Sequence, residues 1–235
     1  MSRQGLWLQE ELPGNPWENM AQDAALLSAL KDGITASPTI RLYRWDRCSV
    51  SYGRLQNAAV IQQRYPELPS VRRPTGGRAV LHGEDLTITI AILAEWLPGQ
   101  SGQGIMTSYR QILSGVVSAL FRVGIPTTYG HERESQSVKT IIDCFELKAG
   151  CDLIDSRNGQ KLLGSAQRRE GNAILQQMSL PLTILLNIPE FICFLKEGFQ
   201  EALQIEGWLT IDRQSGVWYT VKEESEEVCP WLVKS

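Results

Sequence analysis

The segment Arg72-Arg73-Pro74-Thr75-Gly76-Gly77-Arg78-Ala79-Val80-Leu81-His82 combines three arginines, two adjacent glycines and a short apolar run. Because glycine has no Cβ, the Gly76-Gly77 pair lets the backbone approach a ligand closely or adopt positive φ. The planar guanidinium of arginine is a rigid fork of donors that suits carboxylate, phosphate or acyl-oxygen groups. The segment therefore has the composition of a ligand-binding loop. The alternative is a plain Gly-Gly hairpin whose arginines are solvated.

On both sides of this segment the hydrophobic pattern predicts strands. Leu86 to Ile92 alternates strictly, with Leu86, Ile88, Ile90 and Ile92 on one face. Thr39 to Trp45 also has period two, Val50 to Tyr52 is a shorter candidate, and Ala173 to Leu182 is a later one. These segments predict the strands of a sheet, and the arginine-glycine segment leads into the strand from Leu86 to Ile92.

Helices are predicted between the strands. The first extends from Pro16 to Leu30, with Asn15 as its N-cap and Pro16 in its first turn. Apolar residues at helical spacing predict two more long helices, about Thr107 to Phe121 and about Pro189 to Leu203, and Ala58 to Tyr65 is a shorter one. Strands and helices are mixed without strict alternation. The expected fold class is therefore α+β, a mixed and largely antiparallel sheet with packed helices.

Two hairpins are also expected. Asn158-Gly159 is typical of a type I′ turn, here between Cys151–Asp155 and Lys161–Ala166. Trp208 to Tyr219 is a candidate for a late hairpin.

Composition restricts the class of protein. With 235 residues, 43% of them hydrophobic, the chain is expected to form one domain, residues 1–235, without a C-terminal accessory domain. The net charge of −3 gives no basic excess for binding nucleic acid, and no apolar run is long enough to span a membrane. Five scattered cysteines without a CxxC pair, and only two histidines, speak against a zinc site. We expect a cytoplasmic monomer with reduced thiols.

Two further features have chemical potential. Lys161 begins a strand and is followed by the small residues Gly164, Ser165 and Ala166, so its amine can be held rigidly beside a close-approaching substrate. The alternative is an ordinary lysine on an edge strand. Cys144 follows a polar loop rather than an apolar stripe, and a thiolate is a strong nucleophile for thioesters. The alternative is a small buried hydrophobe.

Together these motifs resemble the biotin/lipoate protein ligase and lipoyl/octanoyl transferase family, closest to its cysteine-dependent octanoyltransferase branch. The resemblance extends from about Trp17 to Thr210. Its segments are Trp17–Leu27, Ser49–Gln56, Arg72–His82 with Glu84–Thr87, Cys144-Phe145 and Lys161–Arg168. The loop and lysine motifs are highly specific, whereas the Cys-Phe pair is short.

The resemblance implies a biotin/lipoate ligase-type catalytic domain and an acyl transfer. Acyl carrier protein would donate an octanoyl (or lipoyl) group to Cys144, and a lysine of a carrier domain would then accept that group. The carrier would be the H protein of glycine cleavage or a lipoyl domain of a 2-oxoacid dehydrogenase. Lys161 would steady the thiolate and the acyl oxygen. No metal or cofactor is implied. The implied substrate-binding residues are Arg72, Arg73, Thr75, Gly76, Gly77, Arg78, Val80, His82, Gly164, Ser165 and Ala166.

The sequence departs from the family pattern at Gln177-Met178-Ser179, where the family usually has His-Gly-Ser. Three alternatives to the transferase stay open, and this departure supports the second of them. One is an ATP- and Mg-dependent lipoate-protein ligase, and another is a non-catalytic protein that binds acyl groups or their carrier. The third, biotin ligation, is disfavoured because the order Arg-Arg-Pro-Thr-Gly-Gly-Arg indicates lipoate chemistry.

Overall fold

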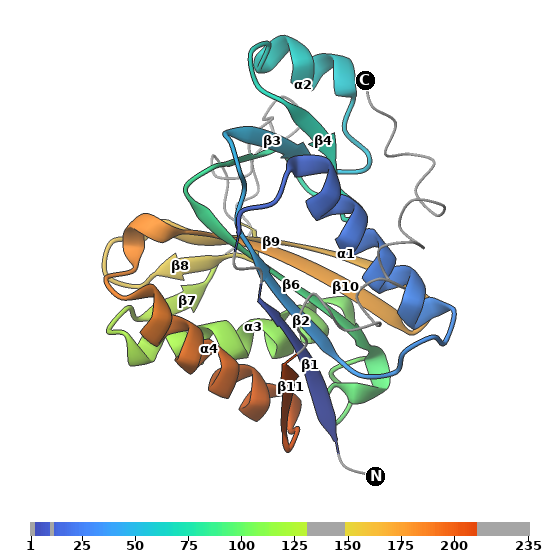
Figure 1. Cartoon of the computed structure of the whole chain (residues 1–235). Coiled ribbons are helices and arrows are strands. Elements are labelled where there is room, and N and C mark those ends of the chain that lie inside the picture. The colour runs from blue at the N-terminus through green and yellow to red at the C-terminus, as the bar shows by residue number, and fades with distance from the viewer. Residues whose placement is uncertain (1–2, 10–11, 131–148, 211–235) are drawn as a thin grey trace.

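The computed structural model describes residues 3–9, 12–130 and 149–210, and within these ranges it is an α+β fold with two sheets (Figure 1). The large sheet has the order β11-β1-β2-β6-β10-β9-β8-β7 and the small one the order β4-β3-β5. The large sheet contains β1 (Gln4–Gln9), β2 (Thr39–Tyr43), β6 (Asp85–Leu93), β7 (Thr127–Tyr129), β8 (Leu153–Asp155), β9 (Lys161–Glu170), β10 (Ala173–Pro181) and β11 (Gly207–Thr210). The small sheet contains β3 (Ser49–Tyr52), β4 (Ser70–Arg72) and β5 (Val80–His82).

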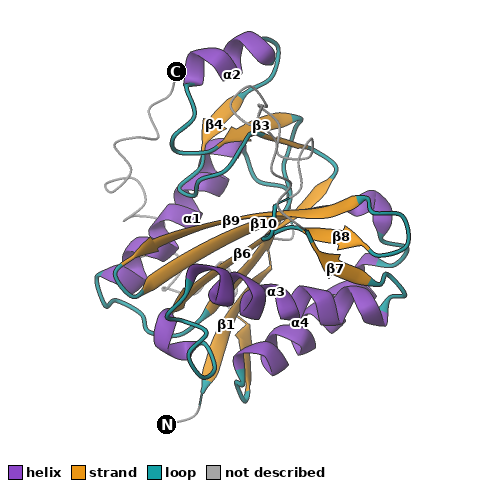
Figure 2. Cartoon of the chain, turned by 180° about the vertical axis from the view of Figure 1, so that it is seen from behind, coloured by secondary structure: helices purple, strands orange, loops and turns teal. Residues whose placement is uncertain are grey.

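Helices cover both faces of the large sheet. The helices α3 (Ile105–Arg122) and α4 (Ile188–Leu203) pack together on one face, and α1 (Pro16–Lys31) lies on the other, against β6 and β10 (Figures 1 and 2). The period-two pattern of β6 explains this layering, because Leu86, Ile88, Ile90 and Ile92 enter the core beneath α3 and α4. Ala91 on the opposite face packs in a second core with the leucines of α1.

The small sheet lies beside α1, with the short helix α2 (Ala58–Arg64) at its outer end (Figure 1). The arginine-glycine segment joins β4 to β5, and β5 is followed almost at once by β6 of the large sheet. The chain thereby places this segment where the two sheets meet.

The predicted fold class is confirmed, and so are the main predicted elements. The Asn15 side chain accepts a hydrogen bond from the Glu18 amide, as a helix N-cap should. All four predicted helices are present, and so are the predicted strands around residues 39–43, 49–52, 85–93 and 173–181. The sheet is largely antiparallel, although β1 pairs in parallel with both β2 and β11.

Two details differ from the expectations. The strand β1 was not foreseen. The hairpin after β8 forms, but its predicted turn type is wrong: only Gly159 has positive φ, whereas type I′ needs it at Asn158 as well. The loop is wider, since the Gly159 amide donates to the Asp155 carbonyl at 2.8 Å and Asn158 Oδ1 accepts from the Gln160 amide. The expected late hairpin from Trp208 to Tyr219 stays a prediction, because residues 211–219 lie outside the described ranges. Its first residues belong to β11, which pairs with β1.

In the described part of the chain, none of the helices combines the length and the apolar character that crossing a membrane would require.

Candidate functional site

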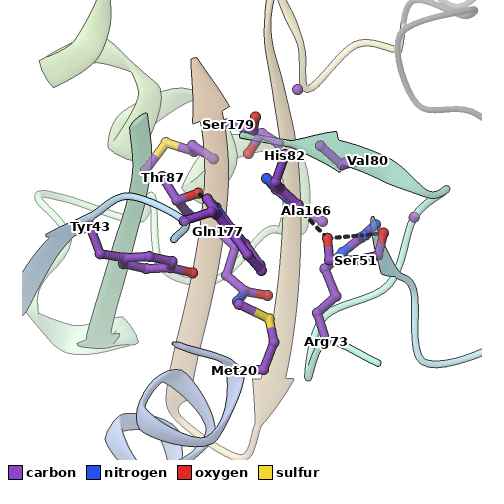
Figure 3. Close-up of a pocket in the computed structure, with 15 residues that line it drawn as sticks. Met20, Tyr43, Ser51, Arg73, Val80, His82, Thr87, Ala166, Gln177 and Ser179 are labelled. Atoms are coloured by element: carbon purple, nitrogen blue, oxygen red, sulfur yellow. Dashed lines mark hydrogen bonds between the residues drawn. The ribbon is translucent and has the colours of Figure 1, made fainter. Parts of the chain in front are cut away.

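A cavity lies where the small sheet meets β9 and β10 of the large one (Figure 3). Its empty space, including the open mouth, is about 410 Å³. Its wall is formed by Met20, Tyr43, Trp45, Ser51, Arg73, Gly77, Val80, His82, Thr87, Gly164, Ser165, Ala166, Gln177, Met178 and Ser179. Residues from both sheets and from α1 thus surround one space.

Arg73 fixes the conformation of residues 74–79, which we call the arginine-glycine loop. Its side chain is buried, and all three guanidinium nitrogens donate to the nearby backbone: Nε and Nη2 to the Gly76 carbonyl, Nη2 also to the Arg78 carbonyl at 2.5 Å, and Nη1 to the Ser51 carbonyl at 3.0 Å. An arginine in this position fixes the shape of the loop around itself. Arg73 is therefore a buried residue of the cavity wall and not a solvated arginine on a surface hairpin.

Gly53, at the end of β3, allows this loop to approach the small sheet. A Cβ atom at position 53 would lie 2.1 Å from the Gly77 carbonyl oxygen. Gly77 itself has φ of +85°, a conformation that favours glycine. The Gly-Gly motif is thus used at Gly77 for its backbone conformation, and Gly53 provides the space.

A buried polar network lies under the cavity floor, centred on Asp23 of α1. The Asp23 carboxylate pairs with the buried Arg41 guanidinium at 2.9 Å and accepts hydrogen bonds from the hydroxyls of Tyr43 and Thr89. Burial, followed by the negative charge of Asp23, raises the pKa of Tyr43 well above its ordinary value, so this phenol keeps its proton. The cost of burying these two charges is offset because each of them also makes hydrogen bonds.

Gln177 connects this network to the arginine-glycine loop. Its Nε2 donates to Asp23 Oδ2 at 2.6 Å, and its Oε1 accepts from the Thr75 hydroxyl at 2.6 Å. Both ends of the amide are used, as its donor and acceptor inventory requires. The residue that replaces the family's usual histidine therefore has a defined structural position.

A second buried polar group lies on the small-sheet side of the cavity. His82 Nδ1 is 2.9 Å from Asp85 Oδ2, and His82 Nε2 is 2.8 Å from Ser51 Oγ. The ring of Trp45 stacks on the imidazole with a centroid separation of 3.8 Å. Burial alone would raise the pKa of Asp85, but interaction with His82 and hydrogen bonds from Ser179 Oγ and the Gly83 amide outweigh it, and the pKa lies below its ordinary value.

Lys161 forms a buried ion pair at the start of β9. Its ammonium is 2.8 Å from Asp152 Oδ2, and both side chains are almost fully buried. The Ala149 amide donates to the same carboxylate oxygen at 2.6 Å. Lys161 is thus held rigidly three residues before Gly164, as its position in the sequence suggested.

The structure brings seven of the proposed substrate-binding residues to the cavity wall: Arg73, Gly77, Val80, His82, Gly164, Ser165 and Ala166. The other four support the loop or its surroundings. Thr75 bonds to Gln177, the carbonyls of Gly76 and Arg78 bond to Arg73, and Arg72 lies over the Tyr52 ring.

Lys161 is absent from the wall formed by the described residues, although its strand provides three wall residues. Cys144 lies outside the described ranges, so its proposed position beside Lys161 stays a prediction.

Several residues of the site were not foreseen from the sequence, namely Met20, Tyr43, Trp45, Ser51 and Thr87 on the wall, with Asp23 and Asp152 behind it. Tyr43 and Trp45 stand at alternate positions of a predicted strand, which indicates a shared face. No comparable local signal indicates that Ser51 would meet His82.

Comparison with known proteins gives a consistent result. Residues 15–204 match the family model described as "Lipoyl protein ligase A/B catalytic domain". A protein named Octanoyltransferase LipM from an Exiguobacterium species is 35% identical over 72% of this chain and 63% of its own length. A protein of the same name from Exiguobacterium sibiricum is also 35% identical, over 77% and 67%. The match thus covers 63% of the length of the first relative and 67% of that of the second.

A solved structure shares the fold. The bi-partite lipoate protein ligase from Thermoplasma acidophilum, described with its E2 lipoyl domain, superposes with a TM-score of 0.69 at 20% identity. The superposition covers 96% of this chain and 92% of that one.

Proposed function

We infer the activity from the premise that the chain belongs to the family of lipoyl protein ligase A/B catalytic domains. We propose that it is an octanoyltransferase of protein lipoylation, acting from octanoyl-acyl carrier protein through a Cys144 thioester. The observation that carries this proposal is the cavity itself, whose wall combines the arginine-glycine loop with the small-residue segment Gly164–Ala166. The name of the two relatives, octanoyltransferase, supports the choice of acyl donor.

The cavity wall suits an aliphatic chain. Val80, Ala166 and Met178 provide apolar surface, and the polar side chains Thr75 and Gln177 are bonded to each other beside it. Burying an acyl chain contributes about 0.8 kcal/mol for each methylene group. A C8 tail would thus bind without any polar recognition along its length.

The proposed chemistry has two steps. The Cys144 thiolate attacks the thioester carbonyl, the new C–S bond forms, and the carrier's thiol leaves with a proton. The neutral ε-amine of the acceptor lysine then attacks the acyl-enzyme, giving an amide and returning the Cys144 thiol. The Lys161 ammonium, fixed by Asp152, would stabilise the negative charge on the thiolate and on the carbonyl oxygen.

The implied partners are octanoyl-acyl carrier protein and an acceptor, either a glycine cleavage H protein or a lipoyl domain of a 2-oxoacid dehydrogenase. The E2 lipoyl domain described with the Thermoplasma ligase is an example of the second class. The reaction as written consumes no nucleotide and needs no metal, and it would take place in the cytoplasm.

Mass spectrometry of the intact protein mixed with octanoyl-acyl carrier protein tests the first step. We expect one octanoyl group bound as a thioester, which neutral hydroxylamine releases, and mapping should place it on Cys144. Cys144→Ala should lose this thioester and the transfer to a lipoyl domain. A thioester that maps to another cysteine would contradict the assignment, and lipoate-dependent consumption of ATP would favour the ligase alternative.

The role of Lys161 is tested separately. Lys161→Arg keeps a cation but changes its geometry, and Lys161→Met removes the charge. We expect both to reduce transfer by about 100-fold or more, a typical loss for a removed oxyanion donor. Normal turnover by Lys161→Met with an unchanged circular dichroism spectrum would refute the role.

A further inference from the structure

Ser51, His82 and Asp85 form a hydrogen-bonded chain at the cavity that the proposed cysteine chemistry does not use. The Ser51 Oγ to His82 Nε2 distance is 2.8 Å and the His82 Nδ1 to Asp85 Oδ2 distance is 2.9 Å. All three side chains are buried, and Figure 3 shows Ser51 and His82 side by side at the cavity. Nucleophile, base and orienting carboxylate follow each other as in acyl-transfer triads, which are recognised by geometry and not by order in the sequence.

The surroundings fix the direction of this chain. Asp85 is held as a carboxylate by hydrogen bonds from Ser179 Oγ, Thr87 Oγ1 and the Gly83 amide, so it accepts a hydrogen bond from the Nδ1–H group of His82. The imidazole then presents Nε2 as the acceptor of the Ser51 hydroxyl proton. Stacking against Trp45 holds the ring in the plane that this requires.

Two further groups favour negative charge at this point. Arg73 Nη1 donates to Ser51 Oγ at 3.2 Å, and a cation in that position stabilises a developing alkoxide. Gly77 lines the same cavity, and its amide has no hydrogen-bond acceptor among the described residues. An amide at the wall that bonds to no acceptor in the described part of the chain is a candidate donor for an acyl oxyanion.

We propose that Ser51 is a second acyl acceptor, activated by His82 and Asp85, which gives the protein an esterase and thioesterase activity independent of Cys144. The substrate class is medium-chain acyl esters and thioesters whose tail enters the cavity.

In the first step the Ser51 oxygen attacks the acyl carbonyl while its proton moves to His82 Nε2. The bond from the carbonyl to the leaving sulfur or oxygen breaks, and the leaving group takes that proton. Water then attacks the serine ester, His82 takes the water's proton and returns it to Ser51, and a free fatty acid leaves. The only co-reactant is water.

The test uses the full-length Cys144→Ala variant, so that a thioester on that cysteine cannot contribute. The protein is incubated with p-nitrophenyl octanoate and, separately, with an alkyl fluorophosphonate that labels activated serines. We expect release of p-nitrophenol and a covalent label on the peptide containing Ser51. Adding Ser51→Ala should abolish the label, and adding His82→Gln should slow p-nitrophenol release by about 100-fold, the usual contribution of a general base.

Ser49 offers the matched control. It lies on the same strand β3, is fully buried, and its hydroxyl has no hydrogen-bond partner within residues 3–9, 12–130 and 149–210. Ser49→Ala in the Cys144→Ala background should keep the label and the hydrolysis. An unlabelled Ser51 in natively folded protein, or hydrolysis that persists in Ser51→Ala, would overturn the proposal.

The outcome is separate from that of the proposed function. Neutral hydroxylamine distinguishes a Cys144 thioester from a Ser51 oxygen ester, and transfer to a lipoyl domain is measured with Cys144 present. The transferase proposal can therefore fail while serine acylation is found, and the reverse also holds.

Discussion

The Arg73 guanidinium holds the loop that precedes β5 by donating hydrogen bonds to backbone carbonyls. Replacing Arg73 tests whether the loop depends on these bonds. Lysine has the same charge, but a single ammonium cannot reach the carbonyls of Ser51, Gly76 and Arg78 together. We expect Arg73→Lys to lower the free energy of unfolding by about 2 kcal/mol, since hydrogen bonds to charged groups contribute about 1.5–3 kcal/mol. Urea denaturation measures this effect.

Arg47→Lys is the comparison for this prediction, because Arg47 is exposed and, of the residues that the structure describes, it pairs only with its neighbour Asp46. Exposed ion pairs contribute little, so its unfolding midpoint should stay close to that of the wild type. Equal effects of the two substitutions would show that the fork geometry of Arg73 is unimportant.

Substitution by alanine is expected to have different consequences at Gly53 and Gly76, although Gly53 lies beside the arginine-glycine loop and Gly76 lies within it. A Cβ at position 53 would lie 2.1 Å from the Gly77 carbonyl oxygen, whereas one at position 76 would meet nothing within 4 Å. We expect Gly53→Ala to destabilise the protein by about 1–3 kcal/mol, as overpacking usually does. Gly76→Ala should unfold at a temperature close to that of the wild type. Differential scanning calorimetry of both variants tests the contrast, and a similar loss in both would contradict it.

At the level of elements, Asp85 joins β5, β6 and β10, because its carboxylate bonds to His82, Thr87 and Ser179. Its lowered pKa in the folded state gives a stability contribution that is complete above the pKa of the unfolded chain, about 3.9. This contribution is lost as the pH falls below that value and through the folded-state pKa. The slope from this one proton is at most about 1.4 kcal/mol per pH unit.

The measurement is a series of urea denaturations between pH 2.5 and 6. Asp85→Asn should be less stable than the wild type at pH 6 and should lose less stability on acidification. Glu67→Gln, on the exposed turn after α2, serves as the surface control and should keep the wild-type slope. If the free energy of unfolding depended on pH in the same way for the wild type and Asp85→Asn, the proposed contribution of the Asp85 carboxylate would be disproved.

Strong local patterns explain which elements the sequence predicted. The residues Leu86, Ile88, Ile90 and Ile92 alternate without interruption, and Asn15-Pro16 is an unambiguous helix start, so β6 and α1 were predictable. The strand β1 has only Leu6, Trp7 and Leu8 as apolar residues and includes Gly5. Its structure depends on parallel pairing with β2 and β11, which are distant in sequence, so its local pattern was insufficient.

In the molecule as a whole, the sequence predicted segments that line the candidate site, but not which polar side chains bond to one another there. The arginine-glycine loop and the Gly164–Ala166 segment were singled out, and both line the cavity. The partners of the polar groups could not be found, because Ser51 and His82, or Lys161 and Asp152, meet only through sheet register and loop closure. Composition also does not show that Arg73 is satisfied by backbone carbonyls.

The clearest such connection runs through Gln177, which bonds to α1 through Asp23 and to the arginine-glycine loop through Thr75. If this amide ties the loop to the core, Thr75 and Gln177 must be energetically coupled. We expect a double-mutant cycle of Thr75→Val and Gln177→Leu, followed by urea denaturation, to give a coupling of about 1 kcal/mol, within the range found for residues in one hydrogen-bonded network. The valine keeps the shape of threonine and removes only its hydroxyl. Strict additivity of the two substitutions would mean that the Thr75–Gln177 hydrogen bond does not help to hold the loop, which would then depend on its other contacts, those of Arg73 among them.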